Sequence, residues 1–175
     1  AMILDEMGPR LSGWKIQIVG TDISGEVLER ARTGLYSQFE IQRGLPIQML
    51  LKHFSQEGDR WRISERLRAM VDLRQHNLLE PNGHLGQFDI IFCRNVLIYF
   101  DVQTKARVLE ALAPRLAPQG AMFLGAAETV IGISTTVLPD RQHRGVYRGQ
   151  NCIHAQPAGL SLPREPVRAI AGGRF

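Results

Sequence analysis

Cysteine is scarce in this sequence, which contains only Cys93 and Cys152 among its 175 residues. A disulfide-rich secreted scaffold needs more cysteines than this, and two free thiols are typical of a reducing cytoplasm. None of the five histidines has a second histidine or a cysteine at the spacing of a zinc site. The sequence therefore predicts a cytoplasmic protein without a metal site.

Long apolar runs are also missing, because no stretch approaches the roughly 18 residues that a membrane-spanning helix needs. The first residues lack the basic-then-apolar pattern of a secretory signal. Aromatic residues make up 7% of the chain, and Trp61 is the only one among the arginines between Arg60 and Arg74. Base stacking needs aromatic side chains interleaved with positive charge, so nucleic-acid binding stays a weak alternative. No insertion into a membrane is expected.

The composition that remains is that of one globular domain, with 44% hydrophobic and 22% charged residues. A net charge of +4 and a pI near 9.5 favour an acidic partner. Much of the excess charge lies in one arginine-rich segment that is predicted to form short strands at residues 61–63 and 67–71; its arginines are Arg60, Arg62, Arg66, Arg68 and Arg74. The segment is either a docking surface or a solvated hairpin, and composition alone leaves both open.

The most informative segment is FDIIFCRNVLIYFD, residues 88–101. Its first apolar run is rich in β-forming residues and too short for a helix, so it predicts a strand buried on both faces. Arg94 and Asn95 follow where that strand ends. Because ligands bind beyond the carboxyl ends of parallel strands, both are candidate site residues. A solvated arginine and a turn asparagine are the equally weighted alternative.

Two further strands are predicted to end in polar residues. IQIV at residues 16–19 runs into Gly20-Thr21-Asp22-Ile23, and Ser24 then caps a helix through Arg32. A carboxylate such as Asp22 can accept hydrogen bonds from both hydroxyls of a ribose, although a capping or turn role alone would be the better assignment. The segment VDLRQHNLL, residues 71–79, ends in Asn77-Leu78, whose amides and leucine side chain suit the edge and face of an adenine.

The rest of the chain continues the α/β pattern. Asp101 is predicted to cap a helix through Leu116 that Pro114 ends or kinks early, residues 121–124 form the next buried strand, and residues 142–148 form a last antiparallel strand. Residues 1–150 are thus predicted to form one domain. Residues 151–175, which contain several prolines and a Gly-Gly pair, are predicted to be a disordered or loosely packed tail.

Taken together, these segments resemble the CheR family, the SAM-dependent methyltransferases of chemotaxis receptors. The matching pieces are GTDIS with VLERARTGLY, VDLRQHNLL, FDIIFCRNVLIYFD and PQGAMFLGAAET; they occur in the family's order and cover roughly residues 14–148. CRNVLIYF is highly specific to the family, whereas TDI and NLL are individually weak. The resemblance implies a Rossmann-like class I SAM-dependent methyltransferase sheet with helices on both faces, and a small antiparallel β insertion at about residues 45–70 that docks receptors.

The resemblance also implies methyl transfer from S-adenosylmethionine to glutamate side chains of chemoreceptors, which yields glutamyl methyl esters and S-adenosylhomocysteine. The cofactor-binding residues that it implies are Asp22, Ile23, Asn77, Leu78, Arg94 and Asn95, and the catalytic residues are Tyr99 and Arg94. Glu128 would either face the same cleft or lie at the surface. A glutamate acceptor is ionised at neutral pH, so the reaction needs positioning rather than a Ser-His-Asp or Cys-His arrangement.

One departure from the family is large. The family's first, central strand and its glycine-rich cofactor loop have no counterpart in the first twenty residues, and neither does its small N-terminal helical domain. The strands on either side of the missing one should then expose unpaired main-chain groups, which invites self-association. The chain alone is therefore not expected to be a fully active monomer.

Three functions remain compatible with the sequence. The first is a receptor glutamate methyltransferase, the second a binding or regulatory module on the same fold, and the third a methyltransferase of another acceptor. The string FCRNVLIYFD favours the first over the third. Nothing in these residues separates the first from the second, because the cofactor loop is the segment that would do so.

Overall fold

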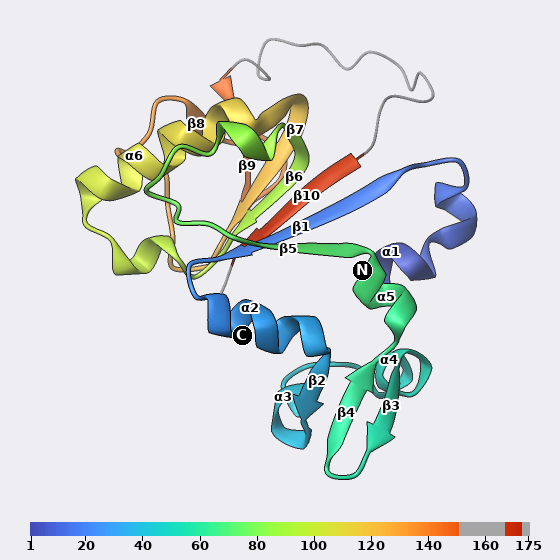
Figure 1. Cartoon of the computed structure of the whole chain (residues 1–175). Helices are drawn as coiled ribbons and strands as arrows, with labels where there is room; N and C mark the ends of the chain where they lie inside the picture. The colour runs from blue at the N-terminus through green and yellow to red at the C-terminus, as the bar shows by residue number, and fades with distance from the viewer. Residues whose placement is uncertain (151–166, 173–175) are drawn as a thin grey trace.

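A computed structural model describes residues 1–150 and the backbone of Val167–Gly172. Its main feature is a seven-stranded sheet with the order β5-β1-β10-β6-β7-β9-β8 (Figure 1). The strands from β5 to β7 run parallel, and β9 and β8 extend the sheet with antiparallel pairing. Their bounds are β1 Ile16–Asp22, β5 Val71–Gln75, β6 Phe88–Cys93, β7 Leu116–Leu124, β8 Val137–Pro139, β9 Val146–Gly149 and β10 Val167–Gly172. The predicted α/β fold class is confirmed.

Helices cover both faces of this sheet, as predicted. The helix α2 (Gly25–Thr33) follows β1 and lies on one face, and α6 (Val102–Leu112) follows β6 and lies on the other (Figure 1). Each begins at a predicted cap: the Ser24 hydroxyl accepts from the Val27 amide, and the Asp101 carboxylate accepts from the Thr104 amide. Before β1 the chain forms α1 (Met2–Glu6) and the short 3₁₀ helix η1 (Gly8–Leu11).

The hydrophobic core lies mainly between α6 and the strands β6 and β7. Phe88, Ile91 and Met122 of these strands belong to one buried cluster with Val108 and Leu109 of α6, and all five are almost fully buried. The strand predicted at residues 121–124 is longer than expected, because the chain is already extended from Leu116. The α-helix ends at Leu112 and continues as one 3₁₀ turn, η4 (Ala113–Arg115), since Pro114 cannot continue the backbone hydrogen-bond pattern.

A small antiparallel sheet with the order β2-β4-β3 is inserted between α2 and β5. It contains β2 (Leu35–Ser37), β3 (Phe54–Glu57) and β4 (Arg60–Ile63), together with α3 (Gln38–Gln42), α4 (Ile47–His53) and α5 (Glu65–Ala69). The insertion is expected from the sequence at about residues 45–70, but it begins at Leu35. The strand expected at residues 67–71 is wrong: most of these residues lie in α5, and only Val71 starts β5.

The central position of the main sheet is occupied, contrary to the expectation that its strand would be missing. The strand β10 lies between β1 and β6 and pairs with both in parallel, from Ile16↔Val167 to Thr21↔Gly172 on one side and from Ala169↔Ile90 to Gly172↔Cys93 on the other. The sequence predicts a loosely packed tail over these residues. Pairing on two sides stabilises an extended segment that local sequence does not specify. The remainder of that tail lies outside the described residues.

Two short 3₁₀ helices complete the fold near the ends of β5 and β6, namely η2 (Gly83–Leu85) and η3 (Leu97–Tyr99). Among the helices of the described residues, none combines the length and the apolar character that crossing a membrane requires.

Candidate functional site

A pocket of about 240 Å³ opens at the carboxyl edge of the parallel sheet. It lies where β1, β5 and β6 end, which is the edge at which the sequence predicted a site. Its walls come from three segments; the lining residues are Thr21, Asp22, Ile23, His76, Asn77, Leu78, Asn95, Val96, Tyr99 and Phe100. Of the predicted site residues, all except Arg94 line this pocket.

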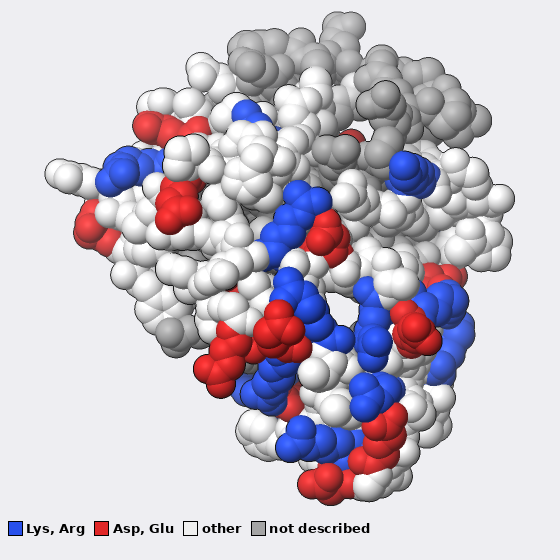
Figure 2. Space-filling model, in the orientation of Figure 1, with Lys and Arg blue, Asp and Glu red and all other residues white. Residues whose placement is uncertain are grey.

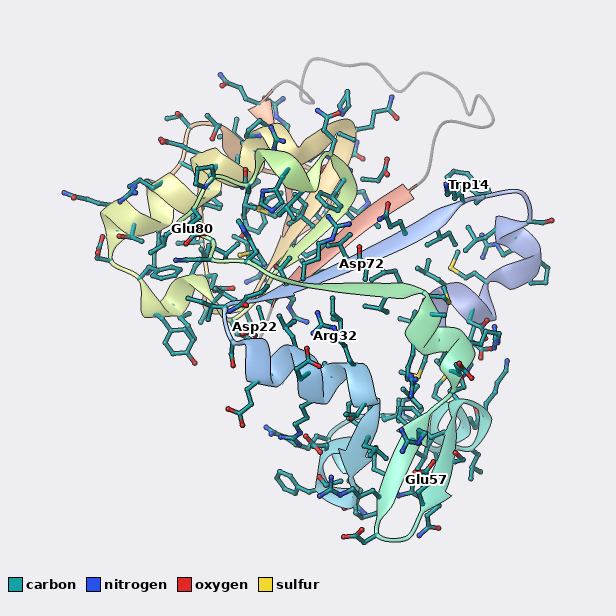
Figure 3. The ribbon with its side chains drawn as sticks, viewed as in Figure 1. Trp14, Asp22, Arg32, Glu57, Asp72 and Glu80 are labelled. Atoms are coloured by element: carbon teal, nitrogen blue, oxygen red, sulfur yellow. The ribbon has the colours of Figure 1, made fainter. Side chains whose placement is uncertain are left out.

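Asp22 is the last residue of β1 and lies beside the start of α2 (Figure 3). One carboxylate oxygen, Oδ1, accepts a hydrogen bond from the Ser24 amide at 2.8 Å. Asp22 therefore forms a local turn, which is one of the two alternatives for this residue, while Ser24 caps the helix. The turn coexists with a position on the pocket wall. Ile23 follows with 65% of its surface exposed, which is unusual for an isoleucine next to a buried strand. An apolar side chain at the rim of a pocket can pack against the face of a ligand.

Asn77 and Leu78 come from the loop after β5. The Asn77 side-chain oxygen accepts from the Leu79 amide at 3.0 Å, so it forms a local turn that fixes the loop. Leu78 is half-buried and packs against the core. The amide nitrogen of the Asn77 side chain, the backbone groups of the loop and the leucine face are then the elements available to a planar ring.

His76 was not singled out from the sequence, although it directly precedes the predicted Asn77-Leu78 pair. It is 7% exposed, and its Nε2 atom has no hydrogen-bond partner among the residues that the structure describes. Burial, together with the nearby His84, lowers the pKa of His76, so the ring is neutral at physiological pH. A buried, unpaired ring nitrogen in a pocket wall is a polar group that a bound molecule or water can satisfy.

Asn95 begins the loop after β6 and has a φ of 58°, the only positive φ of a non-glycine residue in the described part of the chain. A left-handed conformation at a site residue often marks a functional loop. The same loop brings Val96, Tyr99 and Phe100 to the pocket. Arg94 precedes the turn, is exposed and does not line the pocket, so its predicted contact with a ligand stays a prediction.

Glu128 does not lie at the surface, which is one of the two positions that the sequence allows for it. The residue is 8% exposed, and its carboxylate accepts backbone hydrogen bonds from Asn95, Val96, Leu97 and Gly125 at distances between 2.5 and 3.0 Å. The side chain thus supports the pocket loop from behind and is absent from the pocket lining. Spacing alone could not show this, because the four partners are backbone groups.

Cys93 ends β6 close to the pocket, but its chemistry excludes a role as a nucleophile. Burial and the neighbouring Glu128 carboxylate raise the pKa of the Cys93 thiol to about 12. A thiol must ionise to react, so this one is inert at neutral pH in the folded protein. The pocket therefore suits binding and positioning rather than covalent catalysis.

Several side chains of the arginine-rich segment form ion pairs with acidic residues of the same chain. Arg62 pairs with Glu57, Arg66 with Asp5 and Arg74 with Asp72. Figure 2 shows acidic and basic side chains interleaved over the small inserted sheet. The surface therefore carries a mosaic of both signs, and its predicted use for an acidic partner stays a prediction.

Asp5, Glu6 and His53 place potential metal-ligand atoms within 4.8 Å of one another, which the sequence did not reveal because two of them come from α1 and one from α4. His53 Nε2 lies 2.9 Å from Glu6 Oε1, Lys52 lies 2.7 Å from the same oxygen, and Arg66 binds Asp5. Lys52 and Arg66 thus bring positive charge to Glu6 and Asp5. The cluster joins α1 to the inserted subdomain.

The family match and similar curated proteins point to the same protein family. The family described as "CheR methyltransferase, SAM binding domain" matches residues 1–143. The chemotaxis protein methyltransferase Cher2 of Pseudomonas putida is 44% identical over 118 residues, which are 67% of this chain and 43% of that protein. Chemotaxis protein methyltransferase 1 of Vibrio cholerae is 40% identical over 120 residues, which are 68% of this chain and 44% of that protein. The chain spans less than half the length of these relatives.

Among solved structures, "The structure of LepI complex with SAM" aligns with 80% of this chain and 32% of that chain, at 13% identity and a TM-score of 0.34. So low a score supports no argument about this chain. The assignment to a family therefore rests on the sequence relatives and the family match.

Proposed function

The chain belongs to the CheR methyltransferase family, and we propose that its pocket binds S-adenosylmethionine for methyl transfer to glutamate side chains in the cytoplasmic part of chemoreceptors. The observation that supports this proposal most strongly is the convergence of Asp22, Asn77 and Asn95 on one pocket from three separate strand ends. The family match gives this arrangement its chemical meaning.

The lining residues fit the nucleoside part of such a molecule. Asp22 offers a carboxylate for a vicinal diol, Asn77 offers an amide, and Ile23, Leu78 and Phe100 offer apolar surface. The buried Nε2 of His76 adds an unsatisfied polar atom to the same wall. The volume of about 240 Å³ is below the roughly 300–1,000 Å³ of sites that enclose a whole ligand. We therefore assign the pocket to the nucleoside, with the remainder of the molecule outside it.

When bound, S-adenosylmethionine supplies an electrophilic methyl group on a sulfonium. The chain's own residues have to orient that group toward an acceptor and limit the access of water. Tyr99 carries a hydroxyl on the pocket wall and is the residue that we assign to orientation. A glutamate acceptor brings its own negative charge, because its unperturbed pKa of about 4.3 leaves it ionised at neutral pH. No general base on this chain is then required.

Titration calorimetry with S-adenosylhomocysteine tests the binding half of the proposal. We expect saturable binding by the purified 175-residue chain, and weaker binding by the Asp22→Ala variant. A transfer assay with radiolabelled S-adenosylmethionine and a cytoplasmic chemoreceptor fragment tests the other half. Base-labile label in the receptor, released as methanol, would support glutamyl ester formation.

The second function, a binding or regulatory module, makes a different set of predictions for these two assays. It predicts normal binding of S-adenosylhomocysteine with no label in the receptor, and that result would replace the enzymatic proposal. Label that resists base, or that appears in a small molecule, would instead indicate another acceptor. Absence of binding would overturn the assignment of the pocket itself.

A further inference from the structure

Glu128 lies at the junction of two loops that end neighbouring strands. The loop after β7 carries the residue, and the loop after β6 carries three of its four hydrogen-bond partners. Oε1 accepts from the amides of Val96 and Leu97 at 3.0 and 2.7 Å, and Oε2 accepts from those of Asn95 and Gly125 at 2.9 and 2.5 Å. Both oxygens of one carboxylate are therefore fully used.

Only a carboxylate suits this position. Four backbone N–H groups converge on it, so the group between them must accept on both sides and is best negatively charged. A glutamine has the same shape, but its NH₂ would face two N–H donors. Replacing Glu128 with glutamine therefore changes the hydrogen bonds and hardly changes the packing, which makes it a selective probe.

Gly125 makes room for this contact. An added Cβ at Gly125 would lie 2.5 Å from the Asn95 side-chain oxygen and 2.6 Å from Glu128 Oε2, both of which are too close for carbon. The missing side chain thus lets Glu128 and Asn95 approach the end of β7. Alanine at this position would push on the same two residues without removing a charge.

Asn95, the first partner, adopts the left-handed φ of 58°. Such a conformation costs on the order of 1–3 kcal/mol in a residue other than glycine, and it persists only where the surroundings hold it. The bond from the Asn95 amide to Glu128 is one such restraint, and those from Val96 and Leu97 continue it into η3. Asn95, Val96, Tyr99 and Phe100 of this loop form one wall of the pocket.

We propose that Glu128 is a positioning residue, which touches no ligand and holds the loop of residues 95–100 in the conformation that binds the nucleoside. The proposal deepens the function proposed above and rests on it for the identity of the ligand. The geometric part, that Glu128 orders the loop, is independent of any ligand.

The test compares Glu128→Gln with Asp140→Asn in the full chain. Asp140 is the matched control, because it too accepts backbone N–H bonds, from Gln142 and His143, but it lies in the turn between β8 and β9, outside the pocket. Amide hydrogen exchange is measured in both, together with the affinity for S-adenosylhomocysteine at a temperature where each variant is folded.

We expect Glu128→Gln to speed amide exchange by about tenfold or more at the four partners Asn95, Val96, Leu97 and Gly125. This factor corresponds to a fall in the free energy of local opening by about the value of one hydrogen bond. Affinity for S-adenosylhomocysteine should fall by a similar factor. In Asp140→Asn, the exchange rates at these four amides and the affinity for S-adenosylhomocysteine should stay unchanged. Unaltered exchange at these four amides would overturn the ordering role, whether or not the chain binds the ligand. Faster exchange with full affinity would overturn the positioning role, and a parent chain that fails to bind would contradict the proposed function instead.

Gly125→Ala serves if Glu128→Gln does not fold. The added methyl group should displace Asn95 or Glu128 and produce the same pattern of faster exchange and weaker binding, with the carboxylate still present. Normal exchange at residues 95–97 in this variant would show that the loop does not depend on the contact.

Discussion

The backbone N–H of His76 donates to the carbonyl oxygen of Asp22 at 3.0 Å. This bond extends the pairing of β5 with β1 one residue beyond the last strand pair, Asp22↔Gln75. The loop with Asn77 and Leu78 therefore starts at a fixed position relative to the Asp22 carboxylate. Two motifs that are distant in the sequence become two sides of one pocket.

We predict that Asp22→Asn weakens the binding of S-adenosylhomocysteine by about 10- to 150-fold, because a hydrogen bond to a charged group contributes about 1.5–3 kcal/mol. Asparagine keeps an oxygen for the Ser24 amide, so the turn should survive. Titration calorimetry measures the effect. Asp72→Asn is the control, because Asp72 lies on the neighbouring strand outside the pocket and pairs with Arg74. Unchanged affinity would refute the ribose assignment of Asp22.

We predict that Tyr99→Phe slows methyl transfer by about tenfold, the value of one hydrogen bond of about 1–1.5 kcal/mol, while leaving cofactor affinity within about twofold. The reason is that Tyr99 lies at the open side of the pocket, with 64% of its surface exposed. Single-turnover rates and calorimetry separate the two effects. Tyr147→Phe on β9 is the control. Equal single-turnover rates would remove Tyr99 from the reaction.

The strand ends could be predicted from the sequence because short apolar runs specify strands, and parallel strands place their ends at one edge. The expectation that β6 is buried on both faces is wrong, because Asp89 is exposed and Phe92 is 39% exposed. That reasoning brought Asp22, Asn77 and Asn95 to one pocket. It also located the caps Ser24 and Asp101, whose hydrogen bonds are local. Arg94 was included because it adjoins Asn95, but it lies outside the pocket lining.

Long-range relationships could not be predicted in the same way. Glu128 binds backbone groups about thirty residues away, and no residue type at those positions signals the contact. The strand β10 is defined by its two neighbours rather than by its own pattern. Arg66 pairs with Asp5 on α1, some sixty residues earlier. In each case the partner becomes visible only once the chain is folded.

We predict that replacing Arg62, Arg66 and Arg68 with glutamine weakens binding of an acidic chemoreceptor peptide and flattens its salt dependence, because three positive charges leave one surface. The loss should be modest, since Glu57 and Asp5 already offset two of them. Binding is measured at several salt concentrations. The control replaces Arg107, Arg141 and Arg144 with glutamine, which changes the net charge equally at other positions. Identical salt slopes in the two triple variants would show that the inserted subdomain has no special role.

We predict that Asp140 stabilises the fold at neutral pH and ceases to do so in acid. Arg148 and two backbone amides hold the pKa of Asp140 well below its ordinary value. A lowered folded pKa gives stability that is present above the unfolded pKa of about 3.9 and is lost as the pH falls further. Thermal unfolding should therefore separate the parent chain from Asp140→Asn at pH 7, and the two melting temperatures should converge below about pH 4. A constant difference across this range would contradict the assignment.

Finally, we predict that β10 is required to keep Cys93 inert and the sheet monomeric. Gly172 pairs with Cys93 on one side and Thr21 on the other, so removal of β10 leaves main-chain groups of both β1 and β6 without partners. Exposed strand edges pair with other chains. The Cys93 thiol, whose pKa burial and Glu128 raise to about 12, would become more acidic as water reaches it, because the part of the shift that comes from burial is reduced.

The experiment uses a Cys152→Ser background, in which Cys93 is the single thiol. A chain ending at residue 166 should react with a thiol reagent at pH 8 at least about tenfold faster than one ending at Gly172. This factor is expected if the free energy of the opening that exposes Cys93 falls by about the value of one hydrogen bond or more. Light scattering should show the shorter chain self-associating, and a peptide of residues 167–172 should restore slow labelling. If β10 is removed, the facing edges of β1 and β6 should either expose their main-chain groups to water or pair with another chain. Equal labelling rates and equal masses for the two chains would therefore mean that β1 and β6 do not depend on β10.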